Sequence, residues 1–119
     1  MKQILLVDDK ITIGKVLSMY LGKEFELVYR DSAMKAIEWL SEGNDPALII
    51  SDIRMPGMSG IEFLHYLKEN ELLKHIPVIM LSSEESTSER IHLLESGADD
   101  YILKPFNPME LKARIRKYF

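Results

Sequence analysis

Side chains with reactive oxygen or nitrogen atoms follow short apolar runs along this sequence. Asp8 and Asp9 end the first run, Asp52 follows another in the middle of the chain, and Ser82 and Lys104 follow two later ones. Carboxylate oxygens are ligands that Mg²⁺ prefers. An aspartate can act as a nucleophile, and a lysine beside a hydroxyl can hold phosphoryl oxygens. These residue types suit a magnesium-dependent phosphoryl-transfer site if the fold brings them together.

Short apolar runs alternate with helical patterns from end to end, which is typical of βαβ units and a parallel sheet. Continuously apolar runs indicate strands covered by helices on both faces, whereas Glu26 interrupts the second run and places it at an edge. The pattern predicts a flavodoxin-like (βα)5 doubly wound five-stranded parallel sheet of order 2-1-3-4-5. The predicted strands are residues 3–7, 25–29, 47–51, 78–81 and 101–103.

Five helices are expected between and after these strands. Ser32 is a predicted N-cap, Ser59 and Glu62 form a capping-box pattern, and Asn107 precedes Pro108 at a first helical position. Apolar residues at helical spacing are expected to face the core. They are Ile13, Val16, Leu17 and Tyr20; Ala33, Ala36, Ile37 and Leu40; Phe63, Leu64 and Leu67; Ile91 and Leu94; and Leu111, Ile115 and Tyr118.

Ligands bind at the carboxyl ends of the strands in an open parallel α/β sheet. The strands that end at Asp8-Asp9 and at Asp52 are neighbours in the predicted order, so three carboxylates should converge there. Like charges at such distances repel unless a cation lies among them. Each residue alone has an ordinary interpretation as a cap, turn or loop residue. Their combination at strand ends favours a Mg²⁺ and phosphate site.

Four segments of the chain resemble the defining motifs of response-regulator receiver domains. They are LLVDD at 5–9, ISDIRMPGMSG at 50–60, PVIMLS at 77–82 and GADDYILKPF at 97–106. They occur in the family's order and span the chain, so residues 1–119 are interpreted as one receiver domain. The resemblance implies two-component signalling, in which Asp52 accepts a phosphoryl group from a phosphohistidine of a partner histidine kinase. Such a domain is a phosphoacceptor rather than an enzyme acting on an external substrate.

The resemblance also assigns roles to individual residues. It implies Mg²⁺ ligation by Asp9 and Asp52, by Asp8 mostly through water, and by the backbone carbonyl of Arg54. Lys104 would contact the phosphoryl group, and the bond from Lys104 to Pro105 would be cis. Ser82 would swing to a phosphoryl oxygen while Tyr101 turns inward as the second switch residue. Arg54 and Glu84 flank the acceptor with opposite charges and could pair across the mouth of the site.

The C-terminal third resembles the OmpR/PhoB winged-helix branch of the family, especially at residues 110–116. That branch dimerises on phosphorylation through the fourth helix, fifth strand and fifth helix, and controls a DNA-binding output domain. Complementary charges stand at the matching positions, as Arg90 with Glu110, Asp100 with Arg114, and Asp99 with Arg116. The alternatives are that these charges are simply solvated, and that the chain is a stand-alone receiver acting through protein–protein contacts.

Composition excludes several other classes. The 119 residues carry a net charge of −4 with scattered lysines and arginines, so direct nucleic-acid binding is not expected. The chain has no cysteine, which suits a reducing cytoplasm. No apolar run approaches membrane-spanning length, and the N-terminus lacks the pattern of a signal peptide.

Three rival interpretations are weaker. A haloacid-dehalogenase-type phosphohydrolase would need an acid two positions after Asp8, where Lys10 stands. A nucleotide-binding module would need a glycine-rich loop after the first strand, and none is present. A receiver that cannot be phosphorylated would lack site residues that this chain retains. The histidines, His65, His75 and His92, are expected at the surface without carboxylate partners.

Overall fold

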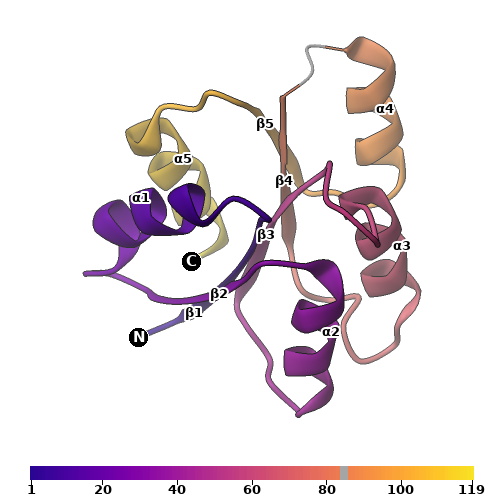
Figure 1. Ribbon diagram of the computed structural model, residues 1–119, viewed down its shortest axis with the longest axis horizontal. Helices are drawn as coiled ribbons and strands as arrows, with labels where there is room; N and C mark the ends of the chain where they lie inside the picture. Colours follow the sequence, from indigo (N-terminus) through magenta and orange to yellow (C-terminus); the bar gives the residue numbers. More distant parts are fainter. Residues whose placement is uncertain (84–85) are drawn as a thin grey trace.

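The computed structural model of this chain describes residues 1–83 and 86–119, which form a five-stranded parallel sheet between two layers of helices (Figure 1). The strands are β1 (Gln3–Val7), β2 (Glu26–Arg30), β3 (Leu48–Asp52), β4 (Val78–Ser82) and β5 (Asp100–Leu103). The helices are α1 (Ile11–Leu21), α2 (Ala33–Ser41), α3 (Gly60–Glu69), α4 (Thr87–Glu95) and α5 (Pro108–Ile115), followed by the short 3₁₀ helix η1 (Arg116–Tyr118).

The strand order is β2-β1-β3-β4-β5, so the predicted flavodoxin-like topology and the edge position of β2 are confirmed. Every predicted strand lies within one residue of the observed one at each end. The pairing register sets Val7 of β1 opposite Ser51 of β3. The residues that follow these two, Asp8 and Asp52, are therefore brought to the same edge of the sheet.

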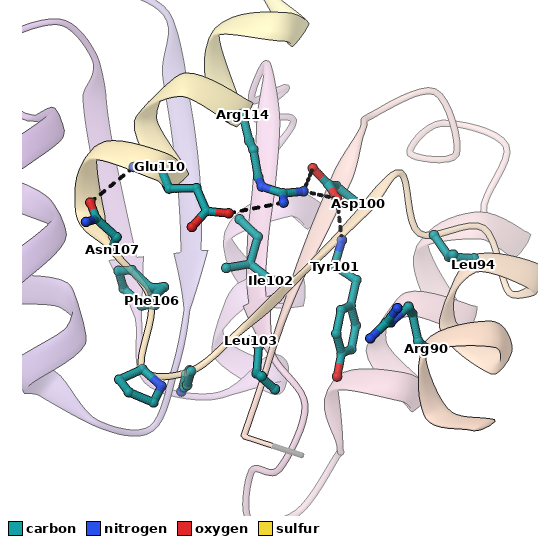
Figure 2. A pocket seen from close by; sticks show the side chains of 12 residues that line it. Arg90, Leu94, Asp100, Tyr101, Ile102, Leu103, Phe106, Asn107, Glu110 and Arg114 are labelled. Carbon is teal, nitrogen blue, oxygen red and sulfur yellow. Dashed lines mark hydrogen bonds and ion pairs between the residues drawn. The ribbon is translucent and has the colours of Figure 1, made fainter. Parts of the chain in front are cut away.

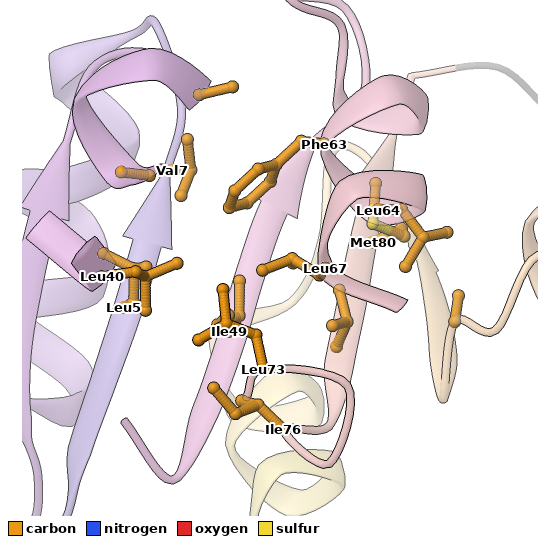
Figure 3. Packing of buried hydrophobic residues seen from close by; sticks show 14 of the residues in the cluster. Leu5, Val7, Leu40, Ile49, Phe63, Leu64, Leu67, Leu73, Ile76 and Met80 are labelled. Carbon is orange, nitrogen blue, oxygen red and sulfur yellow. The ribbon is translucent and has the colours of Figure 1, made fainter. Parts of the chain in front are cut away.

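Alternating residues of the central strands supply two separate apolar cores. Leu5 and Val7 point to the face covered by α2, α3 and α4, whereas Ile4 and Leu6 point to the face covered by α1 and α5. Figure 3 shows the first core, in which Phe63, Leu64 and Leu67 of α3 pack over the strands. Burial on both faces explains why β1, β3 and β4 are apolar without interruption.

The predicted helix starts are confirmed at three N-caps. The Ser32 side chain accepts a hydrogen bond from Lys35 N at 3.2 Å, and Asn107 caps α5 with Pro108 in its first turn. Ser59 and Glu62 form the full capping box at the start of α3. An N-cap stabilises a helix by about 0.5–2 kcal/mol, so these residues help to fix where α2, α3 and α5 begin.

The predicted core-facing residues of α1 and α4 were partly wrong. In α1, Val16 and Tyr20 are exposed, and the buried contacts come from Leu17 and from Leu21 at the helix end. In α4, Ile91 and Leu94 are about half exposed, and Leu93 between them is fully buried. When apolar residues stand next to one another in a short helix, the sequence does not show which of them faces the core. Packing against the rest of the protein decides it.

No helix in the described part of the chain combines the length and apolar character that crossing a bilayer requires.

Candidate metal and phosphoryl site

Three carboxylates meet at the carboxyl edge of the sheet, as predicted. Asp8 and Asp9 follow β1, and Asp52 is the last residue of β3. One oxygen from each lies within 4.8 Å of the others. Asp8 and Asp52 are buried, whereas Asp9 is exposed and its Oδ1 lies 3.7 Å from Lys10 Nζ. Two of the three carboxylates are therefore buried, and the third faces solvent.

Lys104, which follows β5, reaches across this edge to the acidic cluster. Its Nζ lies 2.9 Å from Asp8 Oδ2 and 3.1 Å from Asp52 Oδ1, and its side chain is 13% exposed. Burial lowers the pKa of the ammonium group, but Asp8 and Asp52 outweigh that effect and raise it. Lys104 is thus a fixed positive charge between two buried carboxylates. The bond from Lys104 to Pro105 is cis, as the family resemblance implied.

The two oxygens of Asp52 have different surroundings. Oδ1 accepts hydrogen bonds from the backbone N–H of Ile53 at 2.9 Å and faces Lys104. Oδ2 is buried, yet no described residue donates a hydrogen bond to it. A buried oxygen without a partner carries a desolvation cost that a bound cation would remove. Together with the two nearby carboxylates, this oxygen makes the donor set fit Mg²⁺.

The pKa of Asp52 is raised above its ordinary value. Burial is the largest cause and the negative charge of Asp8 is the second, while Lys104 and the Ile53 N–H act in the opposite direction. Ionising a carboxylate in this position therefore costs free energy, and its charged form is stabilised by any positive charge brought beside it.

Asp8 is held by residues that the sequence interpretation did not assign to the site. The Tyr29 hydroxyl donates to the Asp8 carbonyl oxygen at 2.6 Å, and the Lys10 N–H donates to Asp8 Oδ1 at 2.9 Å. Tyr29 lies on β2 beside β1, so the edge strand also orients the acidic loop. Burial and the nearby Asp8 charge raise the pKa of the Tyr29 hydroxyl, which therefore remains a donor.

Gly60 allows the β3–α3 loop to pass close behind Asp52. Its N–H donates to the Ile53 carbonyl oxygen at 2.7 Å, and a Cβ at this position would collide with the Asp52 carbonyl oxygen. Only a glycine fits this close backbone approach. The segment after β3 is thereby folded back under the site.

Ser82 is the last residue of β4, and its hydroxyl donates to Glu89 Oε1 on α4 at 2.6 Å. Arg54 Nη2 lies 3.5 Å from Glu89 Oε2, and the Glu89 side chain is 13% exposed. Glu89 therefore links the last residue of β4 to the loop after β3. It was not anticipated from the sequence. The predicted pairing of Arg54 with Glu84 falls outside the described residues, because residue 84 is not among them.

Tyr101 lies on β5 and is half-buried against α4. The Arg90 guanidinium stands over its ring, 5.6 Å from the centroid (Figure 2). Both line a hollow of about 570 Å³ on the face formed by α4, β5 and α5. The structure thus places the predicted switch residue at the surface that the dimer hypothesis names.

The six charged residues of the predicted dimer face all have neighbours within their own chain. Arg114 donates to Asp100 Oδ1 at 3.0 Å and to Glu110 Oε1 at 3.1 Å (Figure 2). Arg116 pairs with Glu24 at 3.1 Å, Asp99 accepts from Val78 N–H at 2.8 Å, and Arg90 stacks on Tyr101. Pairing between two copies would have to compete with these contacts.

One prediction about the histidines was wrong. His75 is exposed, but its Nε2 lies 2.9 Å from Asp45 Oδ1, so it does have a carboxylate neighbour. The loop that carries His75 packs beside the one that carries Asp45, a tertiary contact that no helical spacing could reveal. His65 and His92 are exposed, as expected.

Comparison with known proteins identifies the family. The profile described as "Response regulator receiver domain" matches residues 4–116. The chain belongs to the response regulator receiver family. Receiver domains are regulatory parts of two-component systems that interact with histidine kinases. The resemblance found in the four sequence motifs is therefore confirmed over almost the whole chain.

Two curated relatives are transcriptional regulators. The chain is 40% identical over 116 residues to the phosphate regulon transcriptional regulatory protein PhoB of Escherichia coli, covering 97% of this chain and 50% of PhoB. It is 40% identical over 115 residues to the transcriptional regulatory protein SrrA of Staphylococcus aureus, covering 96% of this chain and 46% of SrrA. This receiver chain spans about half the length of the curated relatives it matches.

Solved structures of receiver domains superpose closely on this one. The chemotaxis response regulator CheY4 of Vibrio cholerae matches with a TM-score of 0.90 at 29% identity, covering 100% of this chain and 99% of that one. A signal receiver domain of a histidine kinase from Syntrophus aciditrophicus gives a TM-score of 0.90 at 32% identity, covering 99% and 89%. The receiver fold is thus shared along the full length.

Proposed function

We propose that this receiver accepts a phosphoryl group on Asp52 from the phosphohistidine of a histidine kinase. The observation that carries the proposal is the position of Lys104, whose Nζ lies between Asp8 Oδ2 and Asp52 Oδ1. The second Asp52 oxygen, Oδ2, is buried and receives no hydrogen bond from the residues that the structure describes. A nucleophilic carboxylate, a fixed cation and a cluster of acids able to bind a metal are what phosphoryl transfer requires.

The reaction is a displacement at phosphorus. An Asp52 carboxylate oxygen forms the new P–O bond, the bond from phosphorus to the donor's imidazole nitrogen breaks, and the imidazole leaves with its electron pair and takes up a proton. The Lys104 ammonium group would then shift from the Asp52 carboxylate to the oxygens of the new phosphoryl group, which carry more negative charge. Asp8 keeps Lys104 aligned during this exchange, because it holds the same Nζ at 2.9 Å.

Asp8, Asp9 and Asp52 would hold Mg²⁺, with the backbone carbonyl of Arg54 as a further ligand. When bound, the ion supplies positive charge that offsets the charge of the transferring phosphoryl group. Asp52 Oδ2 supports this assignment because it is buried and no residue in 1–83 or 86–119 donates a hydrogen bond to it. Asp9, being exposed, leaves room for water on the metal's outer side.

The response would pass from Asp52 to α4 through Ser82. A phosphoryl oxygen on Asp52 competes with Glu89 for the Ser82 hydroxyl, and Tyr101 then turns into the space that is vacated. The affected surface is the α4-β5-α5 face, where Arg90, Glu110 and Arg114 would form pairs across a two-fold axis in a homodimer. Asp100 and the pair Asp99 with Arg116 complete the proposed interface.

The relatives support a proposal for the role of the whole protein. PhoB and SrrA are transcriptional regulatory proteins, so we infer that dimerisation of this receiver controls transcription through a DNA-binding output domain. The domain itself would act in the cytoplasm as a phosphoacceptor and not as a turnover enzyme. A stand-alone receiver that binds a different protein through the same face is the alternative.

Intact-mass measurement tests the proposal. Incubation with phosphoramidate and Mg²⁺ should add one phosphoryl group per chain, and EDTA should prevent the addition. A matched Asp45→Asn variant, altered at an exposed acid away from the site, should react like the parent, whereas Asp52→Asn should not react. Equal modification of the Asp52→Asn variant would overturn the assignment of the acceptor.

A further inference from the structure

Two histidines that the proposed function does not use face each other across the α3–α4 contact. His65 lies on α3 and His92 on α4, and their ring centroids are 6.0 Å apart with an interplanar angle of 76°. Both side chains are exposed, so solvent and ions can reach the rings. His65 Nε2 also lies 3.1 Å from the Oγ of Ser96, the C-cap residue of α4, four residues after His92.

This geometry is compatible with two rings on one metal ion. A zinc ion binds imidazole nitrogen at about 2.0–2.1 Å, which places each ring centroid roughly 3 Å from the metal and two centroids roughly 5–6 Å apart. Neutral imidazole is a preferred ligand of Zn²⁺, Cu²⁺ and Ni²⁺, unlike the oxygen ligands that suit Mg²⁺. A shared ion also requires a nitrogen of each ring to point at it, and both side chains are exposed, so their rings can rotate to meet this requirement.

We propose that His65 and His92 form a binding site for a divalent transition metal such as Zn²⁺, which bridges α3 and α4. The Ser96 hydroxyl orients the first ligand. In the tautomer with the proton on Nε2, His65 donates to Ser96 Oγ and keeps the lone pair of Nδ1 for the metal, the arrangement usual for ligating histidines. Solvent completes the coordination sphere.

The site is distinct from the acidic cluster in ligand number and chemistry. Among residues 1–83 and 86–119, Asp8, Asp9 and Asp52 are the only set of three or more candidate ligands within reach of one ion. The histidine pair therefore offers two protein ligands, and its affinity for the metal should be modest. Saturating Mg²⁺ would occupy the acidic cluster, so that added Zn²⁺ reports on the histidines.

A bridge at this position would hold α4 against α3. Glu89, which binds the Ser82 hydroxyl, lies on α4, so the metal would favour the arrangement described here over one in which α4 shifts. That consequence rests on the proposed function, whereas the metal site itself does not.

Titration with Zn²⁺ in excess Mg²⁺ tests the site directly. Calorimetry should give one Zn²⁺ per chain, and the ring proton signals of His65 and His92 should shift in the NMR spectrum while those of His75 do not. His65→Gln and His92→Gln should each weaken binding at least tenfold, and the matched His75→Gln variant should bind like the parent. Parent-like binding by either of the first two variants, or loss in the third, would overturn the proposal.

A second arm separates the site from its consequence for the switch. Beryllofluoride, as a phosphoryl mimic, should weaken Zn²⁺ binding to the parent, because linkage between two sites is reciprocal. Unchanged Zn²⁺ affinity in a chain that has bound beryllofluoride would overturn the coupling of the metal to the switch. Failure of beryllofluoride to bind would count instead against the phosphoacceptor function.

Discussion

The Ser82 hydroxyl donates to Glu89 Oε1 at 2.6 Å, which ties the end of β4 to the first turn of α4. The same carboxylate lies 3.5 Å from the Arg54 guanidinium, on the loop that follows Asp52. Glu89 is therefore placed to compete with a phosphoryl group for Ser82. Whatever draws the hydroxyl toward Asp52 must first break a hydrogen bond to a charged acceptor.

Glu89→Ala should favour the activated arrangement. The variant removes a charge-assisted hydrogen bond, for which typical values are about 1.5–3 kcal/mol, and solvation of the released hydroxyl offsets part of it. Beryllofluoride should therefore bind about tenfold more tightly than to the parent, as measured by calorimetry in saturating Mg²⁺. Glu95→Ala, at an exposed acid on the same helix, is the matched control and should not change the affinity. Weaker binding by Glu89→Ala would mean that Glu89 supports the activated state instead.

Asp9→Asn should stabilise the metal-free domain and blunt its response to Mg²⁺. The change removes one of three negative charges that share a small volume. Because Asp9 is exposed, the gain in unfolding free energy should be about 0.5–1 kcal/mol. Thermal melting without metal should therefore give a higher melting temperature for Asp9→Asn than for the parent. For the parent, Mg²⁺ at about 100 times its Kd should add about 2.7 kcal/mol, and a variant with the same increment would show that Asp9 is not a ligand.

The topology and much of the site could be predicted because several independent signals agreed. Apolar runs marked β1, β3 and β4, caps marked the helix starts, and the strand order then placed Asp8 beside Asp52. The facing direction of α4 could not be predicted, since Ile91, Leu93 and Leu94 are too closely spaced to define one stripe.

Glu89 illustrates a limit of local patterns. Ser86 and Glu89 have the spacing of a capping box, and Ser86 Oγ does accept from the Glu89 N–H at 3.2 Å. The pattern alone would turn the Glu89 side chain back onto its own helix start. Instead the side chain accepts from Ser82, seven residues earlier, because the end of β4 lies within hydrogen-bond distance of the first turn of α4.

The stability of the metal-free domain should depend on pH through Asp52. Burial and the Asp8 charge raise its pKa in the folded state above 3.8, the value for an unperturbed carboxyl. In the window above that value the folded state holds the proton more tightly than the unfolded state, so this group makes stability fall as pH rises. Asp52→Asn removes that contribution.

Melting temperatures measured without metal from about pH 4 upward test whether Asp52 makes stability fall as pH rises. The difference between Asp52→Asn and the parent should grow in favour of the variant as pH rises through the window, and then level off. Mg²⁺ affinity of the parent should rise over the same window, because the ion binds the carboxylate form. A difference that shrinks with rising pH would contradict a raised pKa at Asp52.

The dimer hypothesis predicts a compensating pair of charge reversals. Glu110→Lys replaces attraction to Arg90 with repulsion at two symmetric positions, so it should weaken dimerisation of the beryllofluoride form roughly tenfold. Arg90→Glu in the same chain should restore part of the affinity. Light scattering at low and high salt measures both effects, and the parent dimer should loosen with salt. A beryllofluoride form that stays monomeric at high concentration would exclude this face as the dimer interface.

Mapping the modified residue tests the central claim most directly. After reaction with phosphoramidate and Mg²⁺, borohydride reduces an aspartyl phosphate to homoserine and leaves free carboxylates unchanged. Peptide sequencing by mass spectrometry should then find homoserine at position 52 in the parent, and none when EDTA is present during phosphorylation. Homoserine at position 8 or 9 with Asp52 intact, or its absence from a chain whose mass shows one added phosphoryl group, would contradict Asp52 as the acceptor.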